Sequence, residues 1–424
     1  MKNILVIGGG GREHALAWKF IQSPNTEKVY VAPGNAGTSL EPGIENIDIS
    51  SDDIDGLLAF AKQNKIDLTV VGPEAPLVAG IVDVFTANGL VIFGPRQFNA
   101  QLEGSKSFAK QFMQRCKIPT AAYQEFTVAD KAIEYLSSQS FPIVIKADGL
   151  AAGKGVVIAQ NNKEAVDAVN SMLTDGVHGA AGQKIVIEEF IQGEEVSFIC
   201  IVDHDVVIPL ASSQDHKARD EGDKGPNTGG MGAYSPAPIV NDSLHDRIIE
   251  QVIQPTIQGF IDDGQPYQGF LYAGLMITSS GEPKVLEFNC RFGDPETQPI
   301  LLRLQSDLSE LCWAAARNQL TASELNWSPD TALGVVMAAG GYPFSYDKGA
   351  IISGLDNVAD NTKVFHAGTS HDGTSITTSG GRVLCVTALG KDIQEAQKLA
   401  YEGVDQISWK DAFYRKDIGY RAIK

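Results

Sequence analysis

The stretch KVLEFNCRFGDPETQP, from Lys284 to Pro299, combines strand-forming residues with an unusual number of polar side chains. Successive side chains of an extended chain point to opposite faces, so Leu286 and Phe288 are expected to share one face. The other face then carries three polar residues in a row, which are Glu287, Asn289 and Arg291. The apolar face indicates a core strand. The polar face therefore predicts a binding or catalytic site on a buried element.

Glu287 and Asn289 present hard oxygen ligands two residues apart. Mg²⁺ accepts such a partial set of protein ligands and completes its octahedron with nucleotide phosphates and water. A solvated polar strand is the alternative, but the apolar neighbours indicate burial, and a buried carboxylate requires a partner. We therefore predict a metal site at this pair. Arg291, the next residue on the same face, suits bidentate binding of a carboxylate or a phosphate.

Upstream, the stretch KADGLAAGKGVV (146–157) lies between two predicted strands and carries Lys146 and Lys154. It lacks the P-loop pattern, because Val156 follows Lys154 and Gly155 where that pattern requires Ser or Thr. Glycines and two lysines in a hairpin are typical of a flap that closes over a triphosphate. An ordinary hairpin with a solvated lysine is the alternative.

The stretch IVIEEFIQGEEVSF (185–198) follows the lysine hairpin and places glutamates at the end of a predicted strand. A run of charges is usually a solvated loop. Its position after the hairpin favours nucleotide contacts instead. The backbone of a strand end can bind adenine, and a carboxylate can hold the ribose hydroxyls.

The first glycine loop, IGGGGREHA (7–15), follows a predicted strand and opens a predicted helix. A dinucleotide site requires G-x-G-x-x-G and an acid after the second strand. Glu13 or His14 occupies the third glycine position, and VAPGNAGT, which ends the second strand, contains no acid. What remains is a helix start suited to one phosphate, with Arg12 favouring an anion. The loop PGNAG (33–37) is a second candidate at this sheet edge, and a plain turn is the alternative for each loop.

The pattern of strands and helices divides the chain into three segments. Residues 1–104 alternate strand and helix, which predicts an open parallel α/β sheet with ligands at the carboxyl ends of its strands. Residues 105–327 predict a central domain with a mobile flap subdomain at about 121–191, and residues 328–424 predict a small α+β domain. The expected fold class is therefore multidomain α/β and α+β. The long polar loop at 212–236 is predicted to be functional.

Bulk composition limits the classes of function. The 424 residues are 43% hydrophobic and carry a net charge of −18, which argues against a general basic surface for nucleic acid or an anionic membrane. The five cysteines form no C-x-x-C pair, so neither a zinc site nor a disulfide framework is expected. No uncharged apolar stretch reaches the roughly 18 residues that span a bilayer. We expect a soluble, cytoplasmic protein.

The lysine hairpin, the EEF strand end and the E-x-N strand, in that order, resemble the ATP-grasp superfamily of carboxylate-amine ligases. Within it, longer stretches resemble the glycinamide ribonucleotide synthetase family over essentially the whole chain. These are GGREHALAWK, APGNAGT, VGPEAPLV, QLEGSK, KADGLAAGKGV, SQDHK, GPNTGGMGAYSPAP, EFNCRFGDPETQ, VMAAGGYP, KVFHAGT and GGRVLCVTALG. One departure concerns the metal: many superfamily members place another acid about a dozen residues before the E-x-N pair, and here that place falls near Met276.

The resemblance implies that ATP, glycine and 5-phosphoribosylamine give ADP, phosphate and glycinamide ribonucleotide, the second step of de novo purine synthesis. It implies Mg²⁺ or Mn²⁺, an ATP-grasp central domain, small-molecule substrates only, and a monomer. Phosphoryl transfer needs positioning and charge neutralisation more than a protein nucleophile, and the motifs supply both. Another ATP-grasp carboxylate-amine ligase of nucleotide metabolism is the alternative.

The resemblance also assigns roles to single residues. The predicted ATP contacts are Lys106, Lys146, Gly153, Lys154, Gly155, Glu188, Glu189, Phe190 and Glu195. Glu188 and the backbone near Phe190 take the adenine, and Glu195 takes the ribose. The predicted catalytic residues are Arg291, Lys146 and Lys154, and the predicted metal ligands are Glu287 and Asn289. The predicted substrate contacts are Gly10, Gly11, Arg12, Asn35 and Gly37 for the sugar phosphate, and Asp215 and Asp294 for the amines. Arg291 is assigned to the glycine carboxylate and then to the acyl phosphate.

Two other classes of function are the alternatives. A dinucleotide-dependent oxidoreductase requires the glycine fingerprint that the first loop lacks. A non-catalytic nucleotide-binding regulator is expected to have lost the metal pair or the flap lysines, and this chain retains both.

Overall fold

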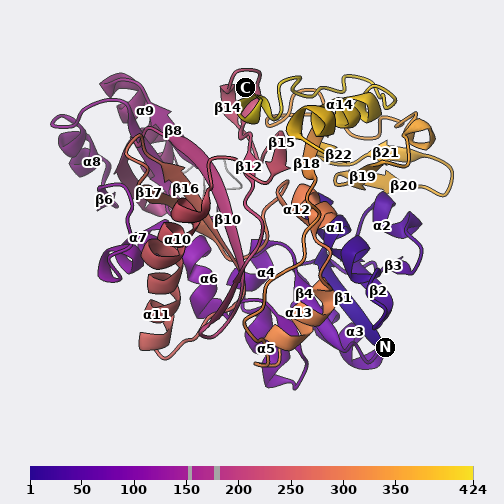
Figure 1. Cartoon of the computed structure of the whole chain (residues 1–424). Helices are drawn as coiled ribbons and strands as arrows, with labels where there is room; N and C mark the ends of the chain where they lie inside the picture. The colour runs from indigo at the N-terminus through magenta and orange to yellow at the C-terminus, as the bar shows by residue number, and fades with distance from the viewer. Residues whose placement is uncertain (151–154, 176–181, 424) are drawn as a thin grey trace.

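A computed structural model of the chain describes residues 1–150, 155–175 and 182–423 (Figure 1). In Figure 1 the N-terminal region lies at the lower right, the C-terminal region lies above it, and the lobe with α8 and α9 projects at the upper left. The strands β10, β16 and β17 lie between these parts. The predicted multidomain α/β and α+β fold is confirmed.

The N-terminal region is an open parallel sheet of order β3-β2-β1-β4-β5. Its elements are β1 (Lys2–Gly8), α1 (Gly11–Phe20), β2 (Thr26–Pro33), α2 (Ala36–Leu40), β3 (Ile44–Asn46), α3 (Ile54–Gln63), β4 (Leu68–Val71), α4 (Glu74–Val78), α5 (Ile81–Ala87), β5 (Ile92–Phe93) and α6 (Gln97–Gly104). Strand β1 is apolar on both faces because Ile4 and Val6 pack into one core while Leu5 and Ile7 pack into another.

An antiparallel sheet of order β11-β10-β16-β17 forms the centre of the molecule. Its elements are α7 (Lys106–Arg115), β10 (Glu194–Asp203), β11 (Val206–Pro209), α10 (Asp242–Ile248), the π-helix η2 (Ile249–Ile253), α11 (Gln254–Asp262), β16 (Gln268–Ile277) and β17 (Pro283–Asn289). Phe198 and Cys200 of β10 face the helices, whereas Ile199 and Ile201 face the N-terminal region. The sheet is therefore buried on both sides.

The flap region is a separate antiparallel sheet of order β6-β9-β7-β8 with its own core. Its elements are β6 (Tyr123–Phe126), α8 (Ala129–Leu136), β7 (Ile143–Ala147), β8 (Val156–Ala159), α9 (Asn162–Leu173) and β9 (Ile185–Glu189). The mobility of this region and its bounds at 121–191 stay predictions.

The C-terminal region contains a sheet of order β12-β15-β18-β22-β19. Its strands and the elements near them are β12 (Gln214–Asp215), β13 (Ala218–Asp220), β14 (Lys224–Asn227), β15 (Gly232–Ser235), α12 (Thr297–Arg303), α13 (Leu308–Ala315), β18 (Thr331–Ala338), η3 (Leu355–Asn357), β19 (Thr362–His366), β20 (Thr369–His371), β21 (Ile376–Thr378), β22 (Arg382–Gly390), α14 (Ile393–Val404) and η4 (Tyr420–Ala422). Strand β15 pairs with β18, so pairing crosses the predicted boundary at 327/328. The domain boundaries stay predictions.

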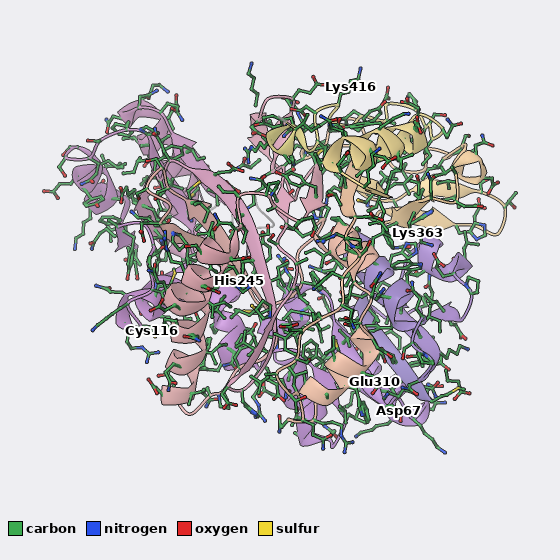
Figure 2. All side chains as sticks on the ribbon, viewed as in Figure 1. Asp67, Cys116, His245, Glu310, Lys363 and Lys416 are labelled. Carbon is green, nitrogen blue, oxygen red and sulfur yellow. The ribbon has the colours of Figure 1, made fainter. Side chains whose placement is uncertain are left out.

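The N- and C-terminal regions meet along α1, α2 and β19. Lys363 of β19, labelled in Figure 2, forms an ion pair with Glu41. His14 Nδ1 of α1 accepts a hydrogen bond from the His366 backbone N–H at 2.8 Å. These contacts hold the first glycine loop next to the C-terminal strands. All five cysteines are free thiols, and within the described ranges no helix is long and apolar enough to cross a membrane.

Candidate active site

A bulge in β17 changes the predicted assignment of its faces. The register pairs on either side of the bulge are Leu275 with Val285 and Gly274 with Glu287. Leu286 is the extra residue, and Val285 and Phe288 both pack into the core. The prediction that Leu286 shares the core face with Phe288 was therefore wrong, because a bulge inserts one residue and resets the alternation. Leu286 is only half-buried.

Beyond the bulge, Glu287 and Asn289 lie in regular register with β16 and therefore share one face. Lys217 is the main cause that lowers the pKa of Glu287 to about 2, so its carboxylate is ionised at neutral pH. The Asn289 Oδ1 atom accepts a hydrogen bond from Arg291 at 2.9 Å. The strand thus presents an ionised carboxylate and an amide oxygen side by side, and both are donors that suit Mg²⁺.

Three lysines from separate elements surround Glu287. The Nζ atom of Lys217, in the segment between β12 and β13, lies 3.1 Å from Glu287 Oε1. Lys146 of β7 and Lys106 of α7 act on the same carboxylate from farther away and lower its pKa further. Lys106 stands at the start of α7, and its Nζ atom donates to the Gly149 carbonyl at 3.2 Å. This gathering of cations around one carboxylate suits a polyphosphate.

Glu188 is buried between two lysines at the junction of the flap region and the central sheet. Its carboxylate lies 3.1 Å from Lys110 and 3.1 Å from Lys146. Lys110 also donates to Thr120 Oγ1 at 2.8 Å, and Lys146 to the Leu286 carbonyl at 3.0 Å. Burial lowers the pKa of Lys110 to about 8. The Glu188 carboxylate is engaged in these ion pairs, and its predicted contact with adenine stays a prediction.

The other predicted nucleotide contacts lie around this junction. Glu189 is exposed at the end of β9 and Phe190 is half-buried after it. The Glu195 Oε2 atom of β10 lies 3.6 Å from Lys217 Nζ, so one lysine joins the predicted ribose and metal ligands. Gly155 is buried and its carbonyl accepts from the Ala147 N–H at 2.8 Å. The two remaining predicted residues, Gly153 and Lys154, lie outside the described residues.

Arg291 connects β17 to the N-terminal region. Its guanidinium lies 2.8 Å from Glu103 of α6 and 3.4 Å from Glu74 of α4. Glu103 also accepts a hydrogen bond from the Cys290 N–H at 2.7 Å, and burial raises the pKa of Glu103 to about 7. A substrate carboxylate at Arg291 would share the guanidinium with these two acids. Its role in binding glycine stays a prediction.

The predicted phosphate contacts of the first loop are largely engaged within the protein. Arg12 is buried, and its Nε atom donates to Glu13 Oε1 at 2.5 Å. The other oxygen of Glu13 accepts from the Gly10 N–H at 2.6 Å. Gly37 packs against the ring of His14 and the Cβ atom of His366. The assignment of the sugar phosphate to this loop stays a prediction.

A cleft of about 420 Å³ opens where the first loop meets the C-terminal region. It is lined by Gly9, Gly10, Pro33, Gly34, Asn35, Asp294, Tyr342, Ala367, Gly368, Thr369, Ser370, Ser379 and Arg382. The side-chain amide of Asn35 connects the first loop to the C-terminal region, because it donates to the Gly9 carbonyl at 3.0 Å and to the His366 carbonyl at 2.8 Å. Within the described residues, Gly10, Asn35 and Asp294 of the predicted set line this cleft, whereas Gly11, Arg12 and Gly37 do not.

Asp294 and Arg382 form an ion pair on the wall of this cleft. Arg382 Nη2 lies 3.0 Å from the Asp294 carboxylate, and Nη1 donates to the Asp294 carbonyl at 2.7 Å. Burial raises the pKa of Asp294, but Arg382 and Arg12 more than offset this and hold it below its usual value. The cleft therefore contains an ionised carboxylate beside a guanidinium.

Asp215 is a buried acid, and no ion pair to its carboxylate is found among the described residues. Its Oδ1 atom has no hydrogen-bond partner within the described residues. Burial raises the pKa of Asp215 well above its usual value, and the nearby Glu296 raises it further. Glu296 itself accepts from Ser197 at 2.9 Å and from Tyr272 at 2.7 Å. A buried carboxylate oxygen without a partner is costly, so the position suits a cationic group of a substrate.

Four residues at the site were not assigned a role from the sequence. They are Lys110, Lys217, Glu296 and Arg382. A weak signal existed for Lys110, which stands one helical turn after Lys106, and for Lys217, which belongs to the quoted SQDHK stretch. Glu296 and Arg382 also belong to quoted stretches, EFNCRFGDPETQ and GGRVLCVTALG. The pairing of Arg382 with Asp294 was not visible, because the two residues are 88 positions apart in the chain.

Models of one protein family match the chain in three successive parts. The N domain of phosphoribosylglycinamide synthetase matches residues 2–103, its ATP-grasp (A) domain matches residues 104–297, and its C domain matches residues 332–421.

Known proteins agree with this match. The chain is 62% identical over 421 residues to a phosphoribosylamine–glycine ligase of Allochromatium vinosum, covering 99% of this chain and 98% of the relative. It is 60% identical over 424 residues to the one of Escherichia coli strain K12, covering 99% of each. The crystal structure of a phosphoribosylamine–glycine ligase from Thermotoga maritima superposes with a TM-score of 0.85 at 32% identity, covering 98% of this chain and 100% of that one. The chain therefore belongs to the phosphoribosylglycinamide synthetase family.

Proposed function

We propose that this chain is a phosphoribosylamine–glycine ligase. It joins glycine to 5-phosphoribosylamine at the expense of ATP and releases glycinamide ribonucleotide, ADP and phosphate, the second step of de novo purine synthesis. The observation that carries the proposal is the identity of 58–62% to ligases of that name over 99% of the chain. A likeness of this extent supports the same reaction.

The geometry supports a route through glycyl phosphate. A glycine carboxylate oxygen forms a bond to the γ-phosphorus of ATP while ADP leaves with the electrons of the broken phosphorus–oxygen bond. The ribosylamine nitrogen then attacks the acyl carbon, and phosphate leaves. Lys106 and Lys146 bind the polyphosphate, and Asp215 accepts the glycine ammonium. Positioning and charge neutralisation suffice for such a transfer, and no protein nucleophile is required.

We assign a divalent metal, Mg²⁺ or Mn²⁺, to Glu287 and Asn289. The ionised Glu287 and the amide oxygen of Asn289 fit such a cation by their chemistry. Within the described ranges no group of three or more His, Cys, Asp or Glu is arranged to hold a metal, and nucleotide oxygens and water would supply the other ligands. When bound, the ion neutralises phosphate charge.

We further propose a monomer that works in the cytoplasm on small molecules, without a nucleic-acid or membrane partner. The net charge of −18 supports the absence of a nucleic-acid or anionic-membrane partner. The three-domain division at 1–104, 105–327 and 328–424 and the flap at about 121–191 belong to the same proposal.

Release of ADP with each substrate omitted in turn tests the function. We expect release that requires ATP, a divalent cation, glycine and phosphoribosylamine together, with glycinamide ribonucleotide identified by mass. Release with a different amine or carboxylate, and none with these two, would favour another ATP-grasp carboxylate-amine ligase. Nucleotide binding without any substrate-dependent release would favour a regulator.

A further inference from the structure

The last residues of the chain pack against the hairpin of β13 and β14 (Figure 1). We call residues 415–421 the C-terminal strap. Arg415 is fully buried, and its Nη1 atom donates to the Ala218 carbonyl at 3.1 Å and to Asp223 at 2.9 Å. Its Nε and Nη2 atoms each donate to Asp417 at 2.8 Å. One buried guanidinium therefore joins the strap to the start and to the turn of the hairpin.

The residue before Lys217 is held by the same strap. His216 is buried, and its Nε2 atom accepts a hydrogen bond from the Gly419 N–H at 3.2 Å. Burial is the main cause that lowers the pKa of His216 to about 4, so the ring is neutral at pH 7 and able to accept. The His216 backbone donates to the Gly232 carbonyl at 2.9 Å and accepts from the Met231 N–H at 2.8 Å. His216 is thus fixed through both its ring and its backbone.

The segment held in this way carries two charged side chains of the site. Asp215, immediately before His216, is the buried acid assigned to the glycine ammonium. Lys217, immediately after His216, lies 3.1 Å from Glu287, the predicted metal ligand. Because Asp215 and Lys217 are the direct neighbours of His216, any shift of the His216 backbone displaces both side chains.

A buried network of charges is a weak source of stability. The desolvation penalty of a guanidinium can exceed the attraction from its ion pairs, and replacement of such a network by apolar side chains is often neutral or stabilising. What the network around Arg415 provides is one geometry for the backbone that it contacts, because its hydrogen bonds end on the Ala218 carbonyl and on the hairpin turn. That backbone continues directly into the site.

We propose that Arg415 and His216 are positioning residues, which fix Asp215 at the place where it receives the glycine ammonium; this rests on the proposed function. Both act through the backbone of the segment and not by contact with a substrate. The loss on disrupting them should be selective. Glycine binding weakens, while the cleft between the first loop and the C-terminal region keeps its affinity, since none of the described residues 214–228 lines it.

Steady-state kinetics of Arg415→Met, with each substrate varied in turn, tests this role. Methionine keeps part of the length of the side chain and removes every hydrogen bond of the guanidinium. We expect the KM for glycine to rise roughly tenfold, since a misplacement of about 1 Å can cost up to a hundredfold. The KM for phosphoribosylamine should stay nearly constant. Arg415→Lys keeps the charge and should recover part of the loss.

Lys416→Met is the matched control. Lys416 is the next residue of the strap, is exposed, and lies at the outer edge of the molecule in Figure 2. This variant should have the wild-type KM for each substrate.

A double-mutant cycle with Asp215→Asn separates positioning from general support of the fold. If Arg415 acts through Asp215, Arg415→Met should add little to the rise in glycine KM that Asp215→Asn causes alone. Effects that multiply would overturn the proposal, as would an unchanged glycine KM in Arg415→Met with only a lower kcat or melting temperature. If Arg415→Met does not fold, His216→Leu and His216→Gln replace it, because only Gln keeps an acceptor for the Gly419 N–H. Leu should then raise the glycine KM and Gln should restore it.

Hydrogen exchange tests the strap without any substrate. Peptides covering residues 213–228 should exchange faster in Arg415→Met than in wild type and in Lys416→Met. Equal exchange in all three would mean that the strap does not fix this segment, and would overturn the proposal. Failure of wild type to form the expected product would contradict the proposed function alone, since the exchange comparison needs neither glycine nor the ribosylamine.

Discussion

At the scale of single residues, the site is a set of charges whose partners come from distant parts of the chain. Glu287 and Asn289 were predictable as a pair because they are two residues apart on a strand, where alternation is a local property. The bulge at Leu286 was not predictable, because it depends on how β17 pairs with β16. The ion pair between Lys217 and Glu287 was also hidden, since 70 residues separate the two.

Glu287→Gln tests the metal pair. The substitution keeps the shape of the side chain and removes the charge that pairs with Lys217 and that is proposed to bind the metal. We expect kcat to fall by a factor equivalent to several kcal/mol of transition-state stabilisation, with little change in the melting temperature. Steady-state ADP release and thermal unfolding measure the two. Glu282→Gln, at an exposed position just before β17, should behave as wild type. Near wild-type turnover by Glu287→Gln would remove the metal from this pair.

Asp215→Asn tests the unpaired acid, and we expect it to separate stability from activity. Burial disfavours the ionised carboxylate, so the neutral amide should stabilise the fold by about 1 kcal/mol, as is common where function has a cost in stability. The KM for glycine should rise while the KM for ATP stays nearly constant. A variant that is less stable and retains its glycine KM would mean that Asp215 is a structural residue.

At the scale of elements, the contact of α1 with β19 sets the edge of the cleft. The parallel sheet of residues 1–104 and the flap hairpin were predictable, because strands and helices alternate locally in the sequence. The pairing of β15 with β18 was not, because no local pattern reveals that residues from the central segment join a later sheet. The C-terminal wall of the cleft, which includes Ser370 of β20, Ser379 and Arg382, was missed for the same reason.

This contact gives the fold a defined dependence on pH. His14 and His366 are both buried, and burial is the main cause that lowers both pKa values from the usual 6.5, that of His366 to about 3. In the unfolded chain both imidazoles take up protons below about pH 6.5, whereas in the folded chain they stay neutral to a lower pH. The free energy of unfolding therefore has its full contribution from them above about pH 6.5 and loses it as the pH falls toward 3. Between pH 7.5 and 5.5 the neutral His366 should lower the free energy of unfolding by about 1 kcal/mol.

Urea unfolding at pH 7.5, 6.5 and 5.5 measures this effect. His366→Gln should reduce the pH dependence of the midpoint, whereas His371→Gln, at an exposed position on β20, should leave it as in wild type. The same slope in His366→Gln and wild type would mean that this imidazole does not contribute.

At the scale of the whole molecule, three regions of the chain contribute residues to the proposed active site. The central sheet with α7 and the flap carry Lys106, Lys146 and the predicted metal ligands, the N-terminal loop supplies one wall of the cleft, and the C-terminal strands supply the other (Figure 1). Arg291, which follows β17, forms ion pairs with Glu74 and Glu103 and so connects this strand to the N-terminal region. The central claim is that the phosphoryl group passes from ATP to the carboxylate of glycine before the amine attacks.

Isotope transfer from glycine labelled with ¹⁸O at both carboxylate oxygens tests that claim most directly. If glycyl phosphate forms, the oxygen that attacks the γ-phosphorus leaves with it, and the phosphate released carries one ¹⁸O for each glycinamide ribonucleotide formed. Mass spectrometry of the phosphate and of the product measures this ratio in a single reaction. We predict one labelled oxygen in the phosphate and one in the new amide. Unlabelled phosphate released together with the product would contradict the account.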